Sequence, residues 1–128
     1  IKILAASSSL PKIDYLHLGS NNLGDEGAEA LSSCDLFSEV KTLNLEQNGI
    51  TERGAKALAA SSALTKLTSL NLVDNRIGDQ GALAIANSDT LSNLTYLHLG
   101  GNRIKSEGTK KALRESKKLT QLKILKAF

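Results

Sequence analysis

One stretch, Leu67–Ile77, recurs along the chain at a fixed spacing, and this repetition limits the possible folds more than any other feature. The asparagine in it belongs to a column whose members are each 27 residues apart: Asn21, Asn48, Asn75 and Asn102. Alternating leucines precede each asparagine, a pattern that indicates a short strand with one buried side. A fixed period of this length predicts stacked repeats of strand, turn and helix.

The 128 residues are interpreted as one domain. Residues 1–12 match 55–66 almost position for position, so we expect the chain to open inside a helix, as an excised piece of a longer array. The fourth copy has one extra residue, which we place among Thr109, Lys110 and Lys111. The predicted division is a partial repeat 1–12, repeats 13–39, 40–66, 67–93 and 94–121, and a partial repeat 122–128.

The helix of each repeat is marked by a small pair, such as Gly54-Ala55, and then by an Ala-Leu or Ala-Ile pair. We expect these small residues to face the sheet. Residues with a side-chain oxygen precede the expected helices, where they can bond the free N–H groups of the first turn. The predicted N-terminal caps are Asp25, Thr51, Asp79 and Ser106.

Composition favours many small core layers, because aromatic residues are only 3% of the chain and Leu, Ile, Val and Ala must fill the interior. Cys34 is the single cysteine, so no disulfide can form within the chain. Its position is occupied by serine in the other copies, so we expect the position to accept a small side chain and the thiol to be chemically inert. These equivalents are Ser7, Ser61, Ser88 and Ser116.

Charge is unevenly distributed: residues 1–102 carry 7 basic and 11 acidic side chains, whereas residues 103–128 carry 9 basic and 2 acidic ones. The basic end is either a solvated surface or a contact for an acidic partner, lipid head groups or nucleic acid. The lack of interleaved aromatic residues disfavours single-stranded nucleic acid. No apolar run approaches the ~20 residues needed to span a bilayer, so we expect no membrane span.

The pattern Leu-x-x-Leu-x-Leu-x-x-Asn-x-Ile/Leu, completed by the Gly-Ala and Ala-Leu pairs, resembles the leucine-rich repeat family, and its length resembles the ribonuclease-inhibitor-like subclass. This resemblance implies a right-handed α/β solenoid with parallel strands on the concave face and helices on the convex face. It also implies protein binding. The run 75–82 is similar to repeats of the Ran GTPase-activating protein, of nucleotide-binding immune receptors and of bacterial effectors.

Residues between the core leucines of each strand are expected to point into the concave space, where packing does not fix their identity. The two tyrosines are the strongest candidates for contact with a partner. A polar face that meets only water is the alternative. The predicted partner-binding residues are Tyr15, His17, Asn44, Glu46, Asn71, Val73, Asp74, Tyr96 and His98. The asparagine column is instead predicted to be structural, with side chains turned inward to bond the backbone.

No catalytic, cofactor or metal site is predicted. His17 and His98 would lie three strand steps apart, roughly 14 Å, which is too far for a shared metal ion. Carboxylates are absent from their column, so a catalytic triad is unsupported. Gly100 and Gly101 lack the partners of a phosphate loop, and we interpret them as an open spot on the concave floor.

These features predict a non-catalytic, monomeric scaffold that binds a protein partner and no small-molecule substrate. The favoured setting is a bacterial effector acting on host proteins, located in the cytoplasm or secreted into a host cytosol. Two alternatives stay open: a fragment of a GTPase activator similar to the Ran-directed family, and regulatory or spacer repeats of a larger receptor or enzyme.

Overall fold

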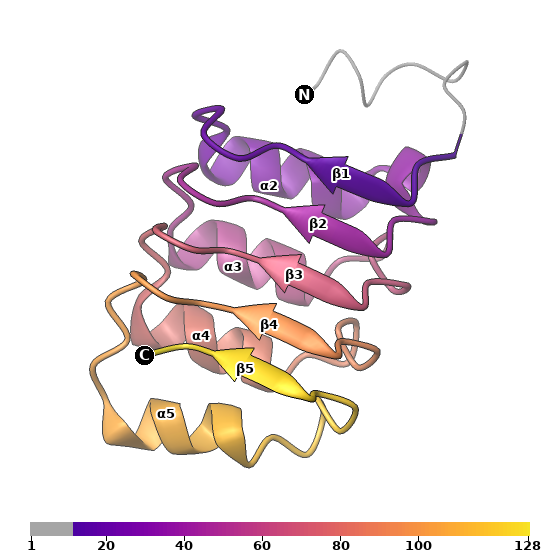
Figure 1. Cartoon of the computed structure of the whole chain (residues 1–128). Coiled ribbons are helices and arrows are strands. Elements are labelled where there is room, and N and C mark those ends of the chain that lie inside the picture. The colour runs from indigo at the N-terminus through magenta and orange to yellow at the C-terminus, as the bar shows by residue number, and fades with distance from the viewer. Residues whose placement is uncertain (1–11) are drawn as a thin grey trace.

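Short strands and helices alternate along residues 12–128, the part of the chain that the computed structural model describes (Figure 1). The predicted opening helix and Ser7 therefore lie outside the described residues. A 3₁₀ turn, η1, follows the first described helix. The elements are β1 (Tyr15–His17), α2 (Gly24–Ser33), η1 (Asp35–Phe37), β2 (Thr42–Asn44), α3 (Glu52–Ala59), β3 (Ser69–Asn71), α4 (Gly78–Ala86), β4 (Tyr96–His98), α5 (Glu107–Arg114) and β5 (Ile124–Lys126).

All five strands form one parallel sheet in the order β1-β2-β3-β4-β5, and the helices stack side by side behind it (Figure 1). Tyr15 pairs with Thr42, Thr42 with Ser69, and Ser69 with Tyr96, which are steps of one repeat. Parallel strands lie ~4.8 Å apart and packed helices ~8–10 Å apart, so the stack curves with the strands inside. The predicted right-handed α/β solenoid is confirmed.

The core is a stack of leucine layers. Alternation along each strand sends one side chain in two toward the helices. Leu43, Leu45, Leu70 and Leu72 are accordingly 0–1% exposed. Each fully buried leucine contributes on the order of 1.5–3 kcal/mol of transfer free energy, and the contribution recurs in every layer. Leu16 of β1 is only half-buried, because β1 has no described strand on its outer side.

Helix α5 contains the extra residue of the fourth copy and still buries two side chains against the core. β4 and β5 pair Tyr96 with Ile124, a step of one residue more than the other pairs make. Thr109 and Leu113 are the buried residues of α5, whereas α4 buries Ala82 and Ile85. Spacings of three and four residues fall on the same side of a helix, so one added residue keeps both side chains inward.

The inner asparagines connect neighbouring repeats. Oδ1 of Asn75 accepts hydrogen bonds from the N–H groups of Asn48 and Ile50, each 3.0 Å long. Nδ2 of Asn75 donates to the carbonyls of Leu45 at 3.0 Å and Leu72 at 2.9 Å. Most of these partners belong to the preceding repeat. Asn48 and Asn102 are also buried, and their side chains likewise bond backbone groups of the preceding repeat.

Asn21 differs from the other members of its column. Its side chain is exposed, and its Nδ2 donates to Gly19 O in its own turn. The bonds of the other asparagines run to the preceding repeat, and no described repeat precedes Asn21. The ladder of inter-repeat bonds therefore begins at Asn48 in the described part of the chain.

Two of the predicted helix caps are wrong in a consistent way. α2 begins at Gly24 and α4 at Gly78, so Asp25 and Asp79 already lie inside the first turn of their own helices. Each carboxylate reaches the next repeat instead. Asp25 Oδ1 accepts from the N–H groups of Thr51 and Gly54, both at 2.8 Å, and Asp79 Oδ1 accepts from two N–H groups before α5. Asp25 therefore caps α3, Asp79 holds the backbone that leads into α5, and both aspartates link neighbouring repeats.

The predicted caps at Thr51 and Ser106 have different outcomes. The Ser106 hydroxyl accepts a hydrogen bond from the Thr109 N–H, so Ser106 caps α5 as predicted. Thr51 precedes α3, but its hydroxyl donates to Asp25 Oδ2 at 2.6 Å and makes no cap bond of its own.

The serine column forms a second set of links between repeats. The Ser88 hydroxyl donates to Ala59 O of the preceding repeat and accepts from the Leu91 N–H. Ser61 and Ser116 make equivalent bonds. Each described copy has a small residue at this position, and in these three copies its hydroxyl also satisfies a carbonyl at the end of the neighbouring helix.

Candidate functional site

The predicted partner-binding residues share the strand side of the sheet. Parallel pairing without a register shift places equivalent residues of successive strands in columns. One column contains both tyrosines and the next contains both histidines. The columns are Tyr15, Thr42, Ser69, Tyr96 and Ile124, and then His17, Asn44, Asn71, His98 and Lys126.

The two tyrosines have the same position in their repeats but different surroundings. Tyr15 is 61% exposed on the outermost described strand. Tyr96 is half-buried, with its ring edge-on to His98 at a centroid distance of 6.3 Å and the Lys126 ammonium 6.0 Å from its centroid. Three strand steps, ~14 Å, separate the tyrosines. They are therefore two separate aromatic groups on one face.

The centre of the face consists of amide and carboxylate groups. Asn71 Nδ2 donates to Glu46 Oε2 at 3.1 Å and links β2 to β3. Oδ1 of Asn44 accepts from the Glu46 N–H at 2.9 Å, and Oδ1 of Asn71 accepts from the Val73 N–H at 3.0 Å. These two asparagines thus fix the backbone at the ends of their strands and also present their amides to the concave space.

His98 is the titratable group most affected by this environment. Burial lowers its pKa, and the positive charge of Lys126 lowers the pKa further. The carboxylates of Asp74 and Glu46 act in the opposite direction, but the pKa remains below the ordinary value. The imidazole is therefore uncharged at neutral pH, with its Nδ1 3.4 Å from the Tyr96 hydroxyl.

The glycines of the fourth copy are not an open spot on the floor, and this prediction is wrong. A Cβ atom on Gly100 would lie 3.1 Å from His98 Nε2, because the imidazole leans over the glycine. A Cβ atom on Gly101 would overlap the Asp74 carboxylate, and Gly101 also has a φ of +69°. The side chains of His98 and Asp74 therefore occupy the space that both glycines leave.

A chain of side-chain hydrogen bonds follows the rim where the strands end. The Ser20 hydroxyl donates to Gln47 Oε1 at 2.9 Å, and Gln47 Nε2 donates to Asp74 Oδ2 at 3.4 Å. These residues border a hollow of ≈ 410 Å³, to which Arg76 also contributes. Ser20, Gln47 and Asp74 have positive φ angles of 51–58°, a conformation that costs energy for residues other than glycine.

Two residues of β5 on this face were missed by the sequence analysis. Ile124, 48% exposed, continues the tyrosine column, and Lys126 continues the histidine column. Both could have been found in the sequence, because each lies 28 residues after the equivalent residue of the fourth copy, Tyr96 or His98. Phe128 is also exposed, but it lies against α5, with the Arg114 guanidinium 4.6 Å from its ring centroid.

The Leucine Rich repeat family matches residues 9–32, 40–59, 63–86 and 90–111, which together make up most of the chain. The chain belongs to the leucine-rich repeat family. Among solved structures, leiomodin-1 actin-binding site 2 is similar, with 26% identity and a TM-score of 0.68. The match covers 92% of this chain and 72% of that one. No curated protein matches the sequence.

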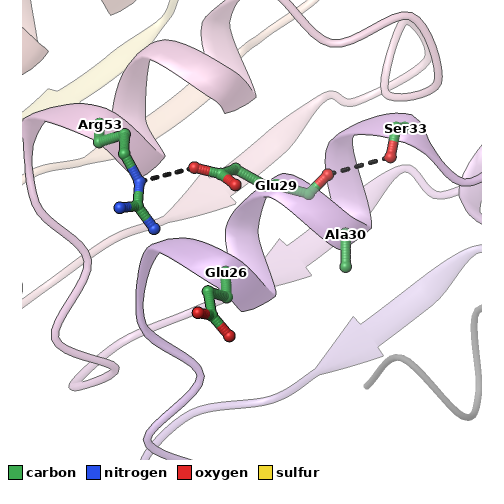
Figure 2. Close-up of a pocket in the computed structure, with 5 residues that line it drawn as sticks. All are labelled: Glu26, Glu29, Ala30, Ser33 and Arg53. Carbon is green, nitrogen blue, oxygen red and sulfur yellow. Dashed lines mark hydrogen bonds and ion pairs between the residues drawn. The ribbon is translucent and has the colours of Figure 1, made fainter.

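The helical face of this leucine-rich repeat carries a shallow hollow between α2 and α3 (Figure 2). Its volume is ≈ 550 Å³. Arg53 Nε lies 2.7 Å from Glu29 Oε1, and the two side chains are 63% and 46% exposed. An exposed pair of this kind contributes ~0–1 kcal/mol. We therefore regard this hollow as a solvated contact between helices, distinct from the strand face.

The strand face of the leucine-rich repeats exposes several kinds of chemical group. Among residues 12–128, no three His, Cys, Asp or Glu side chains cluster closely enough to hold a metal ion. Within the same residues, no helix is both long enough and apolar enough to cross a bilayer. What the strand face offers is aromatic area, amides, two carboxylates and an ammonium group.

Proposed function

We propose that this leucine-rich repeat is a non-catalytic scaffold that binds a partner protein through its strand face. The observation that carries the proposal is the contrast between the two sides of each strand. The inward leucines are uniform from repeat to repeat, whereas the outward residues differ and include two tyrosines and an exposed isoleucine. Aromatic and aliphatic groups on a polar surface are typical of protein interfaces.

Two finer assignments remain proposals. A regular period of 27 residues, with an α-helix of 8–10 residues in each repeat, favours the ribonuclease-inhibitor-like subclass. A bacterial effector acting on host proteins is the setting that the run 75–82 favours by resemblance. Neither assignment changes which face is expected to bind.

Actin is the first partner to test, because the similar solved structure is described as an actin-binding site. The experiment measures co-sedimentation of the chain with actin filaments and its binding to actin monomers. The test variant is Tyr15→Ala/Tyr96→Ala, which removes two large groups from the strand face. The control is Glu29→Ala/Arg53→Ala, which changes only the exposed pair on the helical face.

If actin binds, we expect the tyrosine variant to lose roughly tenfold or more in affinity and the helical-face control to match the parent chain. If actin does not bind, actin is excluded, and affinity capture from a eukaryotic lysate is repeated with the same three proteins. Partners recovered equally by the parent and the tyrosine variant would contradict binding through the strand face.

A further inference from the structure

The strand face has an ordered charge pattern. Glu46 follows β2 and Asp74 follows β3, whereas Lys126 lies on β5. The strands are parallel neighbours in sequence order, so the acidic groups are at one side of the face and the ammonium at the other. At ~4.8 Å per strand step, the strand of Lys126 lies ~10 Å across the sheet from the strand that leads to Asp74 and ~14 Å from the strand that leads to Glu46.

The acidic groups are available for a partner. Glu46 Oε2 accepts one hydrogen bond, from Asn71, and Asp74 Oδ2 accepts one from Gln47. Neither carboxylate forms an ion pair with any residue in 12–128, although Arg76 borders the same hollow as Asp74. The charges of both carboxylates raise the pKa of His98 and so oppose the effects of burial and of Lys126.

The basic group is equally available. Lys126 is exposed and forms no ion pair within the described residues; its ammonium lies over the Tyr96 ring. A cation over an aromatic ring keeps its charge and can still bond an incoming carboxylate. Tyr96 and Ile124 supply apolar area beside it.

We propose that the partner is a protein segment carrying a basic side chain that meets Glu46 and Asp74 and an acidic side chain that meets Lys126, with apolar groups for Tyr15 and Tyr96. This inference rests on the proposed function and adds the chemistry and the direction of the bound segment. Opposite charges in matched order favour one orientation and disfavour the reverse one. In a helix of 1.5 Å per residue, the two charges would be about 7–9 residues apart.

The test is a selection of binders from a displayed library of random 16-residue peptides. Three folded proteins serve as targets: the parent chain, the Tyr15→Ala/Tyr96→Ala variant, and a charge-exchange variant, Glu46→Lys/Lys126→Glu. The exchange leaves the net charge of the chain unchanged, so it tests the order of the charges. Circular dichroism establishes that each variant is folded before selection.

We expect peptides that bind the parent but not the tyrosine variant to carry a basic and an acidic residue in one preferred order. These peptides should bind the charge-exchange variant roughly tenfold more weakly or worse, because each substitution places a like charge against one charged residue of the peptide. Tyrosine-dependent peptides without charge order would overturn this inference and leave the proposed function intact. A selection that yields no tyrosine-dependent peptide would contradict both.

Discussion

At the scale of single residues, Asn75 shows how a polar side chain can hold a repeat array together. It is 3% exposed, and both ends of its amide are bonded to backbone groups of its own and the preceding repeat. A buried backbone group that loses its partner costs the free energy of its desolvation. The asparagine thus contributes through the groups it satisfies rather than through its own contact area.

We therefore predict that Asn75→Ala lowers the free energy of unfolding by about 1–3 kcal/mol. Asn21→Ala is the matched control, because Asn21 has the same position in its repeat but its side chain is exposed and bonds only within its own turn. Urea titrations of the two variants should differ clearly. Equal losses of stability would show that the inter-repeat bonds contribute little.

A second prediction at this scale concerns His98. In Gly100→Ala the new methyl group would lie 3.1 Å from His98 Nε2, so the imidazole must shift by a few tenths of an ångström. Burial is the main cause of the lowered pKa of His98, so a shift of the imidazole toward solvent should raise that pKa toward the ordinary value of about 6.5. An NMR titration of the imidazole measures the change.

The control for His98 is Gly108→Ala, at a helix position where the nearest atom to an added Cβ is Ser106 Oγ at 3.4 Å. The pKa of His98 should be the same in this control and in the parent. If Gly100→Ala also left the pKa unchanged, the imidazole would not lie over the glycine.

At the scale of elements, the starts of the helices are coupled across repeats by aspartates. Asp25 lies in α2 but bonds two N–H groups at the start of α3. Burial raises the pKa of Asp25, but the hydrogen bonds from Thr51 and Gly54 and the charge of Arg53 outweigh it and lower the pKa below the ordinary value. The bonds between α2 and α3 therefore depend on a deprotonated carboxyl.

This coupling predicts a pH dependence. Because the pKa of Asp25 is lower in the folded chain than in the unfolded one, its contribution is complete above the ordinary value of about 3.9 and disappears as pH falls through the lower folded value. Asp25→Asn keeps an oxygen acceptor but cannot titrate. The stability difference between parent and variant should therefore shrink as pH falls from about 4 through the lower pKa that Asp25 has in the folded chain. Unfolding titrations that stay parallel over this range would contradict the assignment.

The aspartates also show where sequence reasoning reaches its limit. The period identified the strands, the asparagine column and the helices, because each depends on the spacing of residues along the chain. The caps were assigned to the wrong helix because a carboxylate in a first turn can reach its neighbour only after the repeats have stacked. The bonds of the serine hydroxyls and the position of the imidazoles over glycines likewise could not be predicted from residue spacing. Contacts between repeats require the three-dimensional arrangement.

At the scale of the whole molecule, the groups that hold the repeats together are largely separate from the outward residues of the sheet. Leucine layers and the asparagine, aspartate and serine links hold the repeats together behind and at the ends of the strands. The outward residues of the sheet are largely free of that role and carry the aromatic and charged groups. A stack of this kind can change its binding face without changing its fold.

Hydroxyl-radical footprinting of the chain alone and bound to its captured partner would test the central claim most directly. We predict that oxidation of Tyr15, Tyr96 and His98 on the strand face falls in the complex, while oxidation of Leu83 in α4 on the helical face stays the same. Protection of Leu83 with unchanged Tyr15, Tyr96 and His98 would contradict recognition through the strand face.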